Sequence, residues 1–138
     1  MLVKHMVSVF YDDLNRSRSE DISAPTWEQI EAAIRGLEKF SRPWITLFLG
    51  DQSENPTENC LTVMGGDGLY WMALSNTEND QLRIFDPKRS SNMVEIWTSD
   101  QGFQDEEFHT TNDIDLVLRI ARYFAGTGGA LPEEVWEP

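Results

Sequence analysis

The clearest structural signal in this chain is Cys60-Leu-Thr-Val-Met-Gly-Gly-Asp-Gly-Leu-Tyr-Trp-Met-Ala-Leu74. Two runs rich in apolar residues, 60–64 and 69–74, flank Gly65-Gly66-Asp67-Gly68. Glycine readily adopts the positive backbone φ angles that a tight turn between antiparallel strands requires. The stretch therefore predicts a β-hairpin.

Further short strands are predicted on both sides of this hairpin. Residues 2–11 are rich in valine and aromatic side chains, and residues 44–49 form a short continuous apolar run. Both patterns are typical of β-strands. Residues 12–25 are polar and carry serine, asparagine and proline, so we expect a loop there that leads into a helix. The remaining strands are predicted at 82–85 and 94–97, with a weak edge strand around 103–109.

Two amphipathic helices are predicted in addition. Thr26 and Gln29 have the spacing of a capping box, in which each side chain bonds the other residue's free backbone N–H. A second helix is expected at about 112–125, where Asn112 caps the first turn and Gly126 supplies the left-handed stop. The first helix is expected at about 26–39, because apolar residues recur there at helical spacing, namely Ile30, Ala33, Ile34 and Leu37.

The order of these elements determines the expected fold class. A chain of 138 residues is about the length of one domain. Strands follow one another without regular alternation with helices, which argues against a parallel sheet. We therefore expect residues 1–138 to form a single α+β domain. Its largely antiparallel sheet has about five to six strands, with the two amphipathic helices packed on it.

The cysteine count and the hydropathy pattern exclude several classes of protein. Cys60 is the only cysteine, so an internal disulfide and a zinc site of paired cysteines are both excluded. No run of about 18 apolar residues exists to span a membrane, and residues 1–11 lack the features of a secretory signal. We expect a cytoplasmic protein without a membrane partner.

Charge is the strongest signal in the composition. The chain has 24 Asp and Glu against 11 Lys and Arg, a formal net charge of −13. This balance opposes direct binding to nucleic-acid phosphates, and it either keeps the protein soluble or steers association with a basic partner. The interval between Arg89 and Arg119 contains no Lys or Arg and seven acidic residues: Glu95, Asp100, Asp105, Glu106, Glu107, Asp113 and Asp115. A purely solvated face more often mixes the two signs.

The motifs of catalysis and of cofactor binding are missing from the sequence. His5 and His109, the only histidines, do not stand at metal-ligand spacings, and Cys60 lies in a predicted strand without a local base. The chain contains no Gly-x-Ser-x-Gly elbow, no phosphate-binding loop and no dinucleotide fingerprint. We therefore predict no catalytic residue, no metal site and no cofactor.

Three groups of residues carry a resemblance to a known family. They are Trp27-Glu-Gln-Ile-Glu-Ala-Ala-Ile34, the Gly65-Gly66 hairpin, and the stretch from Ala121-Arg-Tyr-Phe124 through Gly126, Gly128 and Pro132 to Trp136-Glu137. With these residues the chain resembles family one of the immunity proteins of bacterial polymorphic toxin systems. The resemblance covers about 27–137, so the Arg16-Ser17-Arg18 segment lies outside it.

The resemblance implies a function in binding rather than in catalysis. Such an immunity protein is an intracellular antitoxin that binds the catalytic domain of a cognate toxin and protects the producing cell. The toxins of this family are often nucleic-acid-modifying, notably deaminases and nucleases. A toxin that binds nucleic acid needs a basic cleft, and an acidic protein can fill that cleft by charge complementarity. The resemblance and the composition therefore agree.

Two surfaces are predicted to contact the toxin. The first has Asp105, Glu106 and Glu107 as electrostatic contacts, with Phe103 and Phe108 as aromatic anchors. The second is the acidic loop with Asp51, Glu54 and Glu58. Trp136, near the chain end, is expected either to dock on the domain or to anchor a partner, and docking is favoured.

Two other functions are compatible with the sequence. One is a small enzyme or ligand-binding domain whose pocket is lined by Tyr70, Trp71 and Trp97 together with acidic residues. The other is an acidic scaffold or secretion adaptor that neutralises no toxin. The sequence predicts neither a ligand nor an oligomeric state.

Overall fold

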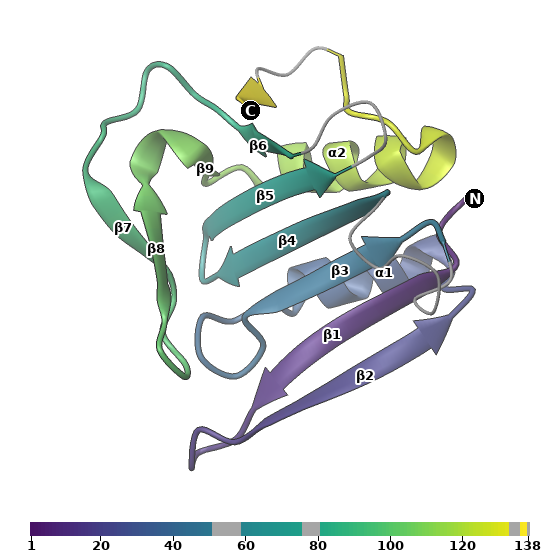
Figure 1. Ribbon diagram of the computed structural model, residues 1–138, viewed down its shortest axis with the longest axis horizontal. Coiled ribbons are helices and arrows are strands. Elements are labelled where there is room, and N and C mark those ends of the chain that lie inside the picture. The colour runs from purple at the N-terminus through teal and green to yellow at the C-terminus, as the bar shows by residue number, and fades with distance from the viewer. Residues whose placement is uncertain (51–58, 76–80, 133–135, 138) are drawn as a thin grey trace.

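The computed structural model describes residues 1–50, 59–75, 81–132 and 136–137, and its fold is α+β (Figure 1). Among these residues, eight strands form a main antiparallel sheet in the order β10-β6-β5-β4-β3-β1-β2, with β9 paired to β5, and β7 and β8 form a separate two-stranded sheet. The elements are β1 (His5–Tyr11), β2 (Ser17–Ser23), α1 (Trp27–Arg35), β3 (Trp44–Phe48), β4 (Cys60–Gly66), β5 (Leu69–Ser75), β6 (Leu82–Ile84), β7 (Met93–Trp97), β8 (Phe103–Glu106), the short 3₁₀ helix η1 (Glu107–His109), β9 (Thr110–Thr111), α2 (Ile114–Thr127) and β10 (Trp136–Glu137). The predicted fold class is confirmed, with more strands than the expected five to six.

The predicted hairpin is confirmed as β4 and β5, with a turn shorter than the four-residue segment suggested. Gly66 pairs with Leu69, so only Asp67 and Gly68 form the turn, and both have positive φ, 55° and 87°. Asp-Gly is a favoured pair for such a two-residue turn. Gly66 itself has φ 128°, and a Cβ there would lie 2.5 Å from the carbonyl oxygen of Leu37. A side chain is therefore excluded where the hairpin meets the end of α1.

Residues 17–23 form strand β2, where a loop was expected, so that prediction is wrong. The strand pairs with β1 along its whole length, from His5 opposite Ser23 to Tyr11 opposite Ser17. It is the edge of the sheet and almost all of its side chains are exposed. An exposed edge strand is held by main-chain hydrogen bonds and needs no apolar alternation, so its polar sequence did not reveal it.

Both helices are present, with ends that differ from the predicted ones. The capping box of α1 is formed, but the helix stops at Arg35, with Gly36 as its C-cap, rather than near residue 39. In α2 the capping residue is Asp113, whose carboxylate accepts the N–H groups of residues 115 and 116, and the left-handed stop is Gly128. Asn112 and Gly126, which were expected in these roles, do not perform them.

The core lies on both faces of the main sheet. The two helices cover one face, and the side chains buried there include Ile30, Ile34, Leu61, Ile120 and Phe124. The β7–β8 hairpin covers part of the opposite face, where a second cluster contains Tyr11, Trp71, Ala73, Ile96 and Trp97. In Figure 1 the helices lie behind the sheet and the β7–β8 hairpin stands at its left edge.

Trp136 docks on the domain, as expected. It lies in β10, which pairs with β6 and places Trp136 opposite Ile84. Its indole N–H donates a hydrogen bond to the carbonyl of Leu131 at 3.1 Å. No helix in the described part of the chain is long and apolar enough to cross a membrane.

Candidate functional site

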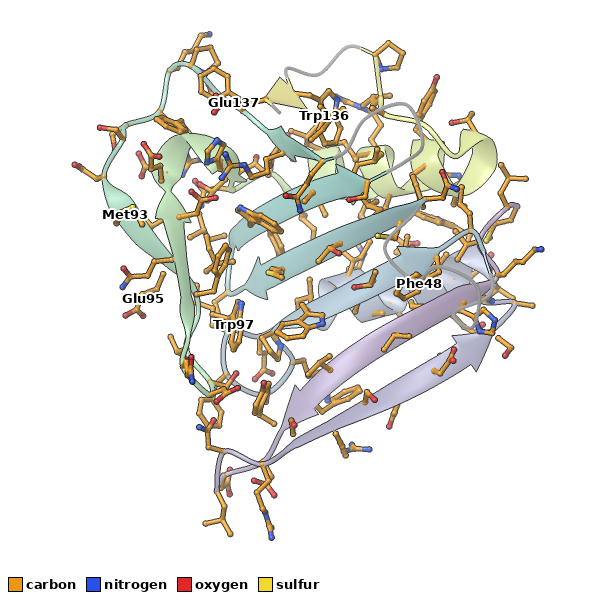
Figure 2. The ribbon with its side chains drawn as sticks, viewed as in Figure 1. Phe48, Met93, Glu95, Trp97, Trp136 and Glu137 are labelled. Carbon is orange, nitrogen blue, oxygen red and sulfur yellow. The ribbon has the colours of Figure 1, made fainter. Side chains whose placement is uncertain are left out.

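The β7–β8 hairpin carries an exposed apolar side chain among carboxylates. Its register places Met93 opposite Glu106 and Glu95 opposite Gln104, so these four residues share one face, which we call the hairpin face. Met93 is 58% exposed, Glu95 and Gln104 are exposed and Glu106 is half-buried. Figure 2 shows Met93 and Glu95 pointing away from the main sheet.

The opposite face of the same hairpin is buried against the sheet. Ile96 and Trp97 are both buried although they are adjacent, because the register shifts between Glu95 and Trp97 and interrupts the normal alternation. Trp97 contacts Tyr11, at 6.2 Å between ring centroids, and Trp44, at 5.0 Å. These aromatic contacts fix the hairpin on the sheet.

Asp105 forms the main polar anchor beneath the hairpin face. It is 8% exposed, and its carboxylate accepts hydrogen bonds from the Trp71 indole N–H at 2.8 Å and from Arg83 at 3.2 Å. The buried His109 donates to it from Nδ1 at 3.0 Å. One carboxylate thus joins β5, β6 and η1 to β8 through contacts within the chain.

Hydrogen bonding keeps Asp105 ionised. Burial acts to raise the pKa of this carboxyl, but hydrogen bonds from His109, Trp71 and the Glu106 backbone N–H, with the charge of His109, hold the pKa below its usual value. A buried carboxylate with several N–H donors is stabilised in its charged form.

A possible metal site is formed by three neighbouring side chains, those of Asp105, Glu106 and His109. One ligand atom from each lies within 4.8 Å of the others. The Asp105 oxygens already accept four N–H groups, and His109 Nε2 lies 3.3 Å from a carboxylate oxygen of Glu137. These hydrogen bonds account for the arrangement, so we assign no metal to it.

Three other residues of the first predicted surface, Glu107, Phe103 and Phe108, make contacts within the chain. Glu107 accepts hydrogen bonds from the backbone N–H and the hydroxyl of Ser90. These hydrogen bonds, together with the charge of nearby Arg89, lower the pKa of the Glu107 carboxyl. Phe103 packs edge-on against Trp71, at 5.3 Å between centroids, and Phe108 packs against Phe85 at the same distance. Of the five predicted residues, Glu106 alone lies on the hairpin face.

The second predicted surface, with Asp51, Glu54 and Glu58, lies outside the described residues. Met93 was missed by the sequence reasoning, and Glu95 was noticed only as part of the acidic interval. In the structure Met93 and Glu95 are exposed and Ile96 is buried, and this alternation is the sequence signal that could have placed Met93 on the surface. Met93 by itself is indistinguishable from an ordinary strand residue.

The pocket expected for a small ligand is not assembled from the predicted aromatic residues. Tyr70 belongs to the cluster under the helices, whereas Trp71 and Trp97 belong to the cluster under the β7–β8 hairpin. Neighbouring residues of β5 point to opposite faces of the sheet, so Tyr70 and Trp71 cannot line one pocket together.

Comparison with family models gives no match, and comparison with curated proteins gives none either. Among solved structures, the chain is similar to one described as the crystal structure of a hypothetical protein from Neisseria gonorrhoeae. The TM-score is 0.60 at 15% sequence identity, over 95% of this chain and 93% of the other. At this sequence identity the likeness shows that the two proteins share a fold, and it gives no information about activity.

Proposed function

We propose that this chain is an immunity protein that binds and occludes the catalytic domain of a cognate polymorphic toxin in the cytoplasm. The toxin is a nucleic-acid-modifying enzyme, such as a deaminase or nuclease, and the immunity protein itself has no catalytic role. The observation that carries this proposal is the hairpin face, where exposed Met93 lies among the carboxylates Glu95 and Glu106.

The chemistry of the hairpin face suits a protein partner. Binding energy at protein interfaces concentrates in a few apolar or aromatic side chains, surrounded by polar residues that exclude water. Methionine adapts its shape to a partner's pocket and is frequent at binding surfaces. In the proposed complex Met93 is the apolar anchor, and Glu95 and Glu106 meet basic residues of the toxin.

The rigid support of this face favours tight binding. Asp105 ties β8 to Trp71 and Arg83, and Trp97 packs against two aromatic rings of the main sheet. A surface already held in its bound shape loses little conformational entropy on association. In this proposal Asp105 positions the face, and the contacts are made by the side chains on its outer side.

The net charge explains how such a protein would find and block its target. An enzyme that holds nucleic acid presents a basic cleft, and a chain of net charge −13 is attracted to that cleft. An acidic hairpin seated there excludes the nucleic-acid substrate. The resemblance to the immunity family supports the same partner class.

The direct test is co-expression with the C-terminal domain of the polymorphic toxin encoded beside this gene. The expected result is a complex that survives purification and a toxin domain without activity. An unbound and fully active toxin domain would overturn the proposal and favour a ligand-binding domain or an acidic adaptor.

Variants locate the surface within that test. Met93→Ala should weaken the complex at least tenfold, the effect typical of an interface anchor. Glu95→Lys should chiefly slow association. Glu28→Lys makes the same change of charge at an exposed position of α1, on the other face of the sheet, and should have little effect. If all three variants bind like the wild type, the hairpin face is not the contact surface.

A further inference from the structure

Three arginines surround a cavity at the end of the β1–β2 hairpin, far along the chain from the acidic interval. The cavity has a volume of about 430 Å³, and Arg16, Arg18 and Arg42 line it together with Phe10 and Ser17. Small-molecule sites commonly have volumes of about 300 to 1,000 Å³. From this geometry we infer a binding site for the phosphate group of a small molecule, a function beyond the proposed toxin binding.

The local charge is opposite to that of the whole protein. Three of the chain's 11 basic residues meet at this cavity, whose lining contains one carboxylate, that of Asp12. Neighbouring guanidinium groups repel one another, and a bound anion removes that repulsion. Three arginines and one carboxylate around one concave place have the composition of an anion site.

The aromatic ring of Phe10 holds two of the arginines in place. The guanidinium carbon of Arg18 lies 4.7 Å from the centre of this ring and that of Arg42 lies 5.8 Å from it. At these distances the ring attracts both guanidinium groups by a cation–π interaction, and each guanidinium carries five N–H donors. Arg42 forms no ion pair with any carboxylate of the described residues.

The ion pairs of the other two arginines leave donors available as well. Arg16 uses Nε to contact Asp12 at 2.8 Å, and Arg18 uses one terminal nitrogen to contact Glu20 at 2.8 Å. Each guanidinium has five N–H donors, so single contacts of this kind leave others for a ligand. Asp12 also accepts the backbone N–H groups of Leu14 and Arg16, which fixes the turn that carries Arg16.

The arrangement of donors favours phosphate over a carboxylate. The three arginines come from the β1–β2 turn, from β2 and from the segment before β3, so three separate segments of the chain bring N–H donors to this cavity. A planar carboxylate matches one arginine fork well, whereas the tetrahedral oxygens of a phosphate can accept from several forks at once. A dianionic phosphate also offsets more of the positive charge.

The test is calorimetric titration of the folded protein with inorganic phosphate, adenosine 5′-monophosphate and acetate at equal ionic strength. We expect saturable binding of both phosphates, with acetate much weaker. Tighter binding of the nucleotide would assign the site to a phosphate ester, equal binding would show that the phosphate group alone is recognised, and tighter binding of the free anion would assign the site to inorganic phosphate. The absence of saturable phosphate binding, or acetate that binds as tightly, would overturn the inference.

Two variants with the same change of charge make the test specific. Arg42→Gln should weaken phosphate binding about tenfold, because it removes charge-assisted donors from the cavity. Arg35→Gln removes the same charge from α1, where Arg35 pairs with Glu31 outside the cavity, and should change binding less than about twofold. Equal losses in both variants would mean unspecific attraction and would overturn the inference. Arg18→Gln serves as a second cavity variant if Arg42→Gln does not fold.

Discussion

Asp105 shows how one buried charge can organise a small protein. Its carboxylate receives N–H groups from Trp71, Arg83, His109 and the Glu106 backbone, so no lone pair faces an apolar surface. A buried carboxylate is tolerated when its hydrogen bonds are complete and is costly when they are not. The position of the β7–β8 hairpin therefore depends on this side chain.

Asp105→Asn should lower the free energy of unfolding by about 2 to 3 kcal/mol, because the amide cannot accept from all of these donors. Urea unfolding monitored by tryptophan fluorescence measures the change. Glu95→Gln makes the same chemical change on the exposed side of the hairpin and should stay within about 0.5 kcal/mol of the wild type. Equal effects of the two substitutions would show that Asp105 is not an anchor.

The same residue should make stability depend on pH in acid. The pKa of Asp105 lies below its ordinary value of 3.8 in the folded protein, so the unfolded chain takes up a proton at higher pH than the folded one. Its contribution is therefore present at pH values well above 3.8 and is lost progressively as the pH falls through 3.8 toward the lower pKa of the folded protein. Urea titrations from pH 6 to about 3 should show a shallower loss in Asp105→Asn than in the wild type. Equal slopes would contradict the shifted pKa.

At the scale of elements, the β4–β5 hairpin depends on a close approach of backbones. Gly66→Ala should destabilise the protein by about 3 kcal/mol, because the new Cβ would meet the Leu37 carbonyl at 2.5 Å and the residue has φ 128°. Thermal unfolding measures the loss. Gly50→Ala, where nothing lies within 4 Å of the added atom, is the control and should have little effect. A stable Gly66→Ala protein would mean that the hairpin can move away from α1.

The start of α2 provides a second test at this scale. Asp113→Ala should lower stability by about 1 kcal/mol, because its carboxylate caps the N–H groups of Asp115 and Leu116. Asp115→Ala removes only a favourable charge in the first turn and should cost about 0.5 kcal/mol or less. Equal losses, measured by denaturant unfolding, would assign the effect to charge alone.

At the scale of the whole molecule, the described residues form two hydrophobic clusters that share one sheet, and their surface has regions of opposite charge. The helices cover one face and the β7–β8 hairpin covers part of the other. The outer side of that hairpin is acidic, whereas the cavity at the end of β1 and β2 is lined by arginines. A basic protein and a small anion would therefore meet different parts of this surface.

If the partner is a basic toxin domain, association should depend strongly on salt. We expect the association rate to fall about tenfold or more as ionic strength rises from roughly 0.02 to 0.5 M, with a smaller change in dissociation. Surface plasmon resonance measures both rates. Glu95→Gln should reduce the slope of the association rate, and a slope that stays the same would argue against the hairpin face as the steering surface.

The elements whose signals are local could be predicted from the sequence. The hairpin around residues 65–68, the Thr26–Gln29 capping box and the helical spacing of Ile30 and Ile34 depend on residues close together in the chain. Each is present, although only Asp67 and Gly68 form the turn itself. The net charge and the single cysteine also follow directly from the sequence. Three features could be seen only in the folded chain: residues 17–23 pair as an edge strand, Asp105 faces Trp71, and Met93 faces outward. The physical reason is that these features depend on strand register and on contacts between distant segments, which side-chain pattern along the chain does not encode.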